Sequence, residues 1–129
     1  MIQSQSILVQ DGIALLGYDP VSYFEGRPQK GTPAYRVESM ELTWWFANQR
    51  HADTFRESPD AFIPQYGGHC ALAMSLGELA PGSPESWSIT NGKLYFHNNG
   101  LTSWLFKMIP GRVSNANAKW AKFAKMGSL

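Results

Sequence analysis

The chain has a single cysteine, Cys70, and this limits how its fold can be held together. One cysteine cannot form an internal disulfide, and it cannot provide a zinc site built from four cysteines. With 129 residues, 43% of them hydrophobic and 13% aromatic, the chain carries enough apolar side chains for one core. We therefore expect a single domain over residues 1–129 that is stabilised by this apolar core.

Charge and hydropathy exclude several classes of partner. The formal net charge of +1 does not predict the concentrated basic surface that nucleic acid requires. No segment approaches the roughly 18 consecutive apolar residues of a transmembrane helix. Residues 1–6 have neither the basic nor the apolar region of a secretory signal. The sequence thus predicts no nucleic-acid partner and no transmembrane segment, and it fits either a cytoplasmic protein or the mature form of a periplasmic one.

Alternating apolar and polar residues predict antiparallel hairpins. Residues 87–96 give the clearest pattern, because two alternating strands flank Asn-Gly at residues 91–92, the pair that favours a type I′ turn. The Asp-Gly pair at residues 11–12 predicts a smaller strand pair. Residues 35–37 and 42–47, rich in aromatic and β-branched side chains, are expected to form further strands.

Capping residues and apolar spacing predict several short helices. Asp19 before Pro20 is typical of an N-cap followed by the first helical residue. Asn48 is typical of the cap of a helix over residues 49–57, and a last helix is expected over residues 112–126. Because these elements show no regular βαβ alternation, they predict the α+β class.

The C-terminal helix is expected to dock on the rest of the domain. One side of it carries the apolar residues Val113, Ala116, Trp120 and Phe123, and partly opposite lie Lys119, Lys122 and Lys125. A basic amphipathic helix can also lie on an anionic membrane surface. Amphipathic spacing is, however, the ordinary pattern of a helix that covers a core, and docking is the favoured interpretation.

The segment around Cys70 is the main candidate for chemistry. Two glycines precede it, His69 adjoins it, and a helix is predicted over residues 70–76. The start of a helix favours the thiolate form of a cysteine, and Met74 would share the same helical face. Thiolate, thioether and imidazole ligands suit monovalent copper. The candidate ligands of a soft-metal site are therefore Cys70 and Met74 with either His51 or His69.

These residues also have plainer interpretations. A free cysteine is among the most buried residue types, and Met74 at helical spacing is typical of a core position. A reactive thiol is a further alternative, and a Cys70–His51 dyad is the one nucleophilic arrangement that the sequence offers. His51 is otherwise expected to start a helix beside Phe55, and His97 to lie at the surface. No hydrolase, phosphate-loop or metalloprotease motif occurs, so no motif supports catalysis.

Tyr18, Asp19 and Trp45 form a second candidate site. As a helix cap Asp19 needs no chemical role; alternatively, Tyr18 and Asp19 lie on the rim of a ligand pocket that faces Cys70. Trp44 and Trp45 are expected to point to opposite faces of one strand. One of the two should therefore be less buried and contact a ligand or partner, whereas most other aromatic side chains fill the core.

Several motifs occur in the order typical of the YHS-domain family. They are GYDPVSYF at residues 17–24, WFA at residues 45–47, SPD at residues 58–60, PQYGGHCA at residues 64–71 and GKLY at residues 92–95. The match as a whole extends over roughly residues 14–110, and the chain resembles the small stand-alone YHS proteins of bacteria. The resemblance implies an α+β domain related to treble-clef-like modules of metal-handling proteins, in which cysteines hold the metal.

The chain departs from the metal-binding members at the implied ligand positions. Ser22 stands where the resemblance implies a cysteine, and Ala47 and His51 stand where it implies a Cys-x-x-x-Cys pair. Because a structural zinc ion takes four ligands, a closed zinc site is not expected.

Three functions remain open at this point. The first is a non-catalytic, metal-related binding protein of YHS type, with copper or zinc as the candidate ion and a metal-handling protein as the candidate partner. The second is a thiol-dependent redox or catalytic protein that uses Cys70. The third is a protein-interaction module without a metal.

Overall fold

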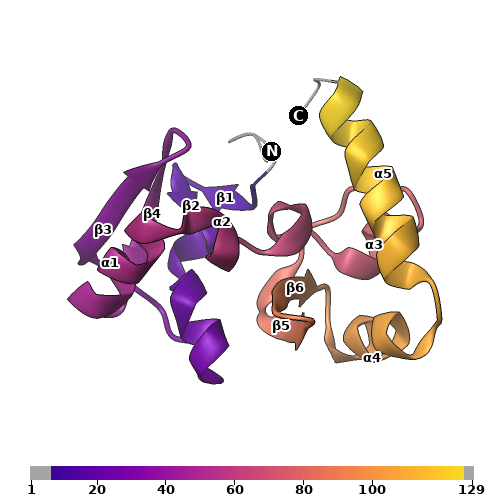
Figure 1. The fold of residues 1–129 in the computed structure, drawn as a ribbon, viewed down its shortest axis with the longest axis horizontal. Coiled ribbons are helices and arrows are strands. Elements are labelled where there is room, and N and C mark those ends of the chain that lie inside the picture. The colour runs from indigo at the N-terminus through magenta and orange to yellow at the C-terminus, as the bar shows by residue number, and fades with distance from the viewer. Residues whose placement is uncertain (1–6, 127–129) are drawn as a thin grey trace.

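Two groups of β-strands organise the chain, one in each half (Figure 1). The structure, a computed structural model, describes residues 7–126, with side chains as far as residue 122. The first half forms a four-stranded sheet in the order β1-β2-β4-β3, and the second half forms the two-stranded hairpin β5-β6. The strands are β1 (Val9–Gln10), β2 (Ile13–Ala14), β3 (Thr32–Ser39), β4 (Leu42–Phe46), β5 (Ser83–Thr90) and β6 (Lys93–His97).

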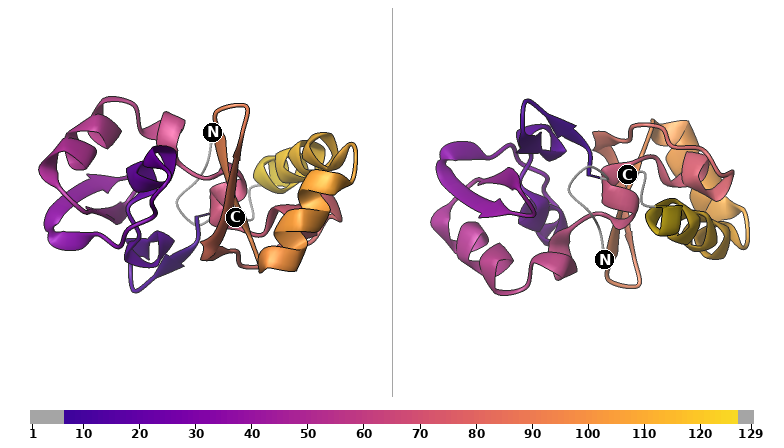
Figure 2. Two further views of the ribbon diagram at one scale, coloured as in Figure 1. Left: turned by 90° about the horizontal axis from the view of Figure 1, so that it is seen from below. Right: turned by 90° about the horizontal axis from the view of Figure 1, so that it is seen from above.

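Short helices connect and cover these strands. The 3-10 helices are η2 (Leu15–Gly17), η3 (Pro20–Glu25) and η4 (Gln65–Gly68), and the α-helices are α1 (Gln49–Glu57), α2 (Pro59–Phe62), α3 (Ala71–Ser75), α4 (Gly100–Met108) and α5 (Arg112–Met126). Hairpin β5-β6 lies between the first sheet with α1 and the helices α4 and α5 (Figure 2). Among residues 7–126, no helix combines the length and the apolar composition needed to cross a membrane. The expected α+β class is confirmed.

The hairpin turns have the backbone conformation that their sequences predict. Residues 11–12 have φ angles of 56° and 79°, and residues 91–92 have φ angles of 52° and 75°. Positive φ at both central residues is the type I′ conformation, which matches the twist of paired strands. A third such turn, at residues 40–41 with φ angles of 54° and 62°, joins β3 to β4. Strand β3 is longer than the strand predicted over residues 35–37.

The core consists of two clusters of buried side chains that share strand β6. Leu94 and Phe96 belong to the first cluster, and Tyr95 between them belongs to the second. The first is built around Trp44, Phe46 and Phe55, and the second around Tyr66, Met74, Phe106 and Ala116. Because successive residues of a strand point to opposite faces, β6 is a wall common to both clusters. This strand joins the two halves into one domain.

Helix α5 packs against α3, as expected for an amphipathic helix that covers a core. Ala116 is fully buried, and the ring centroid of Trp120 lies 6.0 Å from that of Tyr66. The predicted docking of this helix is therefore confirmed. The side chains of Phe123 and Lys125, also assigned to faces of this helix from the sequence, lie outside the described ones.

Candidate functional site

Asp19 is completely buried, and its carboxylate accepts hydrogen bonds from several segments. Oδ1 accepts from the amides of Val21 and Ser22 at 2.8 and 3.1 Å, which confirms the predicted cap of η3. Oδ2 accepts from the amide of Ala47 at 2.8 Å and lies 2.6 Å from Nδ1 of His51. Asp19 is therefore both a helix cap and the contact that ties η3 to the end of β4 and to α1.

His51 lies between two carboxylates and is 2% exposed. Besides its contact with Asp19, its Nε2 is 3.1 Å from Oε1 of Glu25 and 3.3 Å from Nη2 of Arg50. This nitrogen donates to Glu25 when it is protonated and accepts from Arg50 when it is not. A hydrogen bond from Arg50, with a further contribution from His51, lowers the pKa of Glu25. Both ring nitrogens of His51 are thus engaged within this cluster.

Cys70 is buried directly before α3, with 2% of its surface exposed. Its amide donates to the carbonyl of Ala80 at 2.8 Å, and its carbonyl accepts from the amide of Met74 at 3.0 Å. Met74 is fully buried, and the ring centroid of His69 lies 6.4 Å from that of Trp120. Cys70, His69 and Met74 are therefore neighbours around the start of α3.

The candidate metal ligands fall into two groups in space. Helix α1, which carries His51, and helix α3, which follows Cys70, lie on opposite sides of hairpin β5-β6 (Figure 1, Figure 2). His51 meets Asp19 and Glu25 there instead of Cys70. Within residues 7–126, no group of three or more His, Cys, Asp and Glu side chains is arranged to hold a metal ion.

The three residues proposed for a ligand pocket have different surroundings in the structure. Trp44 is fully buried and Trp45 is partly exposed, so the expected difference between these neighbours is present. Trp45 lines a surface hollow of about 370 Å³ beside the β1-β2 turn, together with Gln10, Asp11, Ile13 and Leu16. The ring of Tyr18 instead lies under Lys30, whose Nζ is 5.8 Å from the centroid of that ring. Asp19 faces His51.

His97 is not at the surface, contrary to expectation. It is completely buried, with Nε2 2.9 Å from Oγ of Ser88 and its ring centroid 5.5 Å from that of Phe106. Burial and the nearby charge of Lys107 lower its pKa from 6.5 to about 4, so the ring is neutral at pH 7. The sequence contains a signal for this position, because His97 lies two residues after the buried Tyr95 on the same face of β6.

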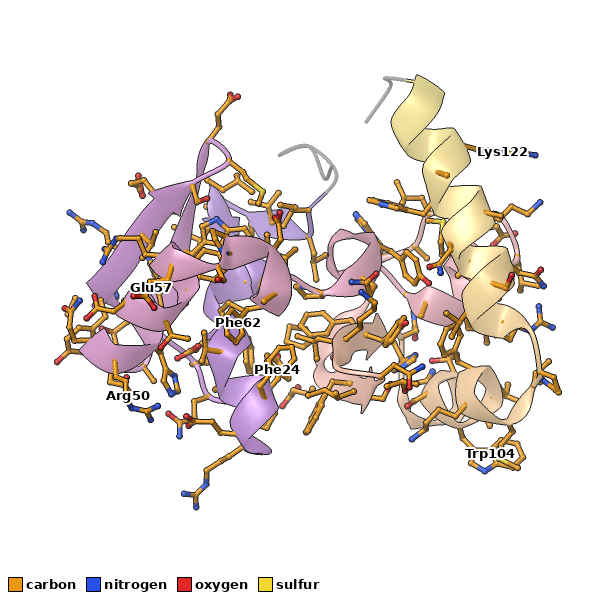
Figure 3. The ribbon with its side chains drawn as sticks, in the orientation of Figure 1. Phe24, Arg50, Glu57, Phe62, Trp104 and Lys122 are labelled. Carbon is orange, nitrogen blue, oxygen red and sulfur yellow. The ribbon has the colours of Figure 1, made fainter. Side chains whose placement is uncertain are left out.

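The outer side of α4 is apolar and exposed to solvent. Leu101, Trp104 and Met108 have exposed fractions of 65%, 55% and 61%, and Trp104 extends away from the molecule (Figure 3). Trp104 is therefore an exception to the expectation that most aromatic side chains fill the core. The buried side of the same helix carries Ser103 and Phe106.

Comparisons of the chain with protein-family models, with curated proteins and with solved structures give no match. The resemblance to the YHS-domain family stays a prediction from the motifs of residues 17–95.

Proposed function

We propose that this chain is a non-catalytic interaction module that binds a protein partner through the outer side of α4. The residues of this surface are Leu101, Trp104 and Met108, and we call them the α4 face. Contiguous large apolar side chains that stay exposed in a folded domain are typical of interaction sites. Their exposure, more than half of each side chain, is the observation that carries the proposal.

The geometry of the α4 face suits a helix that is bound in a groove. Its residues occupy positions i, i+3 and i+7 of one helix, so they point in similar directions. The opposite side of α4 is anchored by Phe106, which is 4% exposed. The helix is therefore held in place without help from its outer face. Tryptophan is also one of the residue types most enriched at the centres of binding interfaces.

The charge distribution in the last third of the chain favours an acidic partner. No aspartate or glutamate occurs after Glu85, whereas this part of the chain contains Lys93, Lys107, Arg112, Lys119, Lys122 and Lys125. Lys107 is exposed on α4 itself. We therefore infer that the partner has an apolar groove edged by carboxylate side chains. A groove is favoured over a membrane surface because α4 carries a single basic side chain, Lys107, whereas interfacial helices are rich in lysine and arginine on their polar side.

The test compares two exposed aromatic residues. Trp104→Asp should weaken capture of the partner from a cell extract by about a hundredfold. The matched control Tyr35→Asp, at a side chain 37% exposed on β3, should leave capture unchanged. The captured protein should have an apolar groove edged by carboxylate side chains. Capture should weaken as the salt concentration increases. Capture that survives Trp104→Asp would contradict the proposal, as would Trp104-dependent binding to anionic lipid vesicles in place of a protein.

A second candidate function is soft-metal binding at Cys70, with copper(I) as the ion and a metal-handling protein as the partner. One observation favours it: the Cys70 thiol and the Met74 thioether belong to one helical turn, and His69 adjoins them. A thiol-dependent redox or catalytic function has less support, because Cys70 is 2% exposed and reactive cysteines need access.

A competitive copper(I) titration of the reduced protein, with zinc alongside, tests the metal proposal. Cys70→Ser should abolish stoichiometric copper binding. His51→Gln should leave it unchanged, because both nitrogens of His51 are already engaged by Asp19, Glu25 and Arg50. An affinity that Cys70→Ser does not alter would exclude this site.

A further inference from the structure

A second hollow, larger than the one beside Trp45, lies at the corner between α4 and α5. Its volume is about 440 Å³, and Phe106, Ile109 and Val113 form its apolar wall. Two cationic side chains, Lys107 and Arg112, also line it, and no aspartate or glutamate does. An apolar hollow with charges of a single sign is the usual form of a site for a small amphipathic ligand of opposite charge.

The positive charges of this hollow have no anionic partner within the described part of the chain. The salt bridges among residues 7–122 involve neither Lys107 nor Arg112. Nε of Arg112 is buried and has no hydrogen-bond acceptor among the described residues. A buried N–H group without an acceptor is costly, so a ligand acceptor that reaches this nitrogen would be bound favourably. The ring of His97 contacts that of Phe106, and the charge of Lys107 helps to lower the pKa of His97.

The first turn of α5 adds to the positive potential. The hollow is lined by residues 110–114, where the helix begins, and the amide of Asn115 is bonded to the carbonyl of Gly111 at 2.9 Å. Amides that precede Asn115 in a helix have no partner within it, and they carry the positive end of the helix dipole. No acidic side chain occupies the first turn of this 15-residue helix.

We propose that the hollow binds a small organic carboxylate, whose carboxylate group lies between Lys107, Arg112 and the first turn of α5. The apolar part of the ligand lies against Phe106, Ile109 and Val113. The charge pattern selects an anion, and the apolar wall selects an organic acid over an inorganic ion.

Titration calorimetry of the full chain with hexanoate near neutral pH tests the proposal. Hexanoate should bind saturably, whereas hexylamine, a cation of similar length, should not bind. Lys107→Gln and Arg112→Gln should each weaken hexanoate binding by about tenfold, the effect of losing one charged hydrogen bond. Lys122→Gln, at an exposed lysine that points away from the molecule on the same helix (Figure 3), is the matched control and should have no effect. Lys107→Arg, which keeps the charge, should retain binding.

Three results would overturn the proposal. They are a lack of saturable hexanoate binding, hexanoate binding that both Gln variants leave unchanged, and binding of inorganic phosphate as tight as that of hexanoate. Circular dichroism of each variant shows whether it is folded. Lys107→Arg tests separately whether the positive charge at residue 107, and not the lysine itself, is what hexanoate binding requires. Hexanoate binding does not require the α4 face, so Trp104→Ala, which adds no charge beside Lys107, should leave it intact. The failure of either proposal can therefore be recognised separately.

Discussion

The carboxylate of Asp19 joins the start of η3 to the end of β4 and to α1, which lie 28 and 32 residues further along the chain. It binds the start of η3, the amide of Ala47 after β4 and the ring of His51 in α1. Ser22, Ala47 and His51 are also the positions at which the YHS resemblance implies metal ligands, and all three donate to this carboxylate. A buried carboxylate surrounded by N–H donors therefore holds these segments together by hydrogen bonds. Its burial is tolerated only while those donors remain.

Asp19→Asn is expected to destabilise the fold by about 3 kcal/mol. The NH₂ group of the asparagine would face the amide of Ala47 and the ring of His51, which are donors to Oδ2 in the wild type. A role as helix cap alone predicts almost no change, since Asn caps helices as well as Asp does. Urea unfolding measures the difference, with Asp53→Asn as the control because the Asp53 side chain is 59% exposed. Equal stability of the two variants would show that the negative charge of Asp19 does not stabilise the fold.

The buried, neutral ring of His97 makes stability depend on pH. Its pKa is about 4 in the folded protein and 6.5 as a free side chain, so the unfolded chain takes up the proton first as the pH falls. The stability from the neutral ring is therefore present above pH 6.5 and is lost as the pH falls toward 4, by up to about 3 kcal/mol.

Urea unfolding of the wild type and of His97→Gln at pH 7 and pH 4 measures this dependence. The variant cannot take up the proton, so its disadvantage relative to the wild type should shrink at the lower pH. A difference between the two proteins that does not change with pH would show that the ring is not held neutral.

At the scale of elements, sequence signals predict structure where they act through neighbouring residues. Asn-Gly at residues 91–92 sets the β5-β6 turn, Asn48 caps α1, and the apolar spacing of residues 112–126 predicts α5. The parallel pairing of β2 with β4, through Ile13 and Thr43, has no such signal. It depends on where distant segments pack, which local propensity does not specify.

The close approach of the start of β5 to η4 leaves no room for a side chain at Gly82. A Cβ there would lie 2.4 Å from the carbonyl oxygen of Gly68 and 2.7 Å from Cβ of Phe96. We expect Gly82→Ala to cost about 2 kcal/mol, because backbone must move. Gly100→Ala, whose Cβ would meet nothing within 4 Å at the start of α4, is the matched control. Thermal unfolding that places both variants at the wild-type midpoint would contradict this.

At the scale of the whole molecule, the sequence leaves the important contacts undetermined. Asp19 and His51 are 32 positions apart, and each has a sufficient local explanation of its own. Helix α4 is apolar on two sides, and periodicity does not tell whether Phe106 or Trp104 meets the core. The net charge of +1 also conceals that every acidic residue lies at or before Glu85. This uneven distribution is visible in the sequence once charges are counted by segment.

The docking of α5 should stabilise both core clusters, because they share β6. Ala116→Asp places a carboxylate at a fully buried position and is expected to cost about 3 kcal/mol. Ala118→Asp, at an exposed position of the same helix, should be nearly neutral. Tryptophan fluorescence and near-UV circular dichroism should give coincident unfolding transitions for both variants. Separate transitions would mean that the clusters unfold independently.

The position of β6 between two clusters has a consequence for how the length of the chain can change in evolution. Inserting or deleting one residue within β6 turns the following side chains to the opposite face. Leu94 and Phe96 would then leave the first cluster, and no register would satisfy both clusters at once. The hairpin turns at residues 11–12 and 91–92 are different, because a Cβ at either glycine meets nothing within 4 Å. Insertions among descendants of this sequence should therefore accumulate at these turns, while the length of β6 stays fixed.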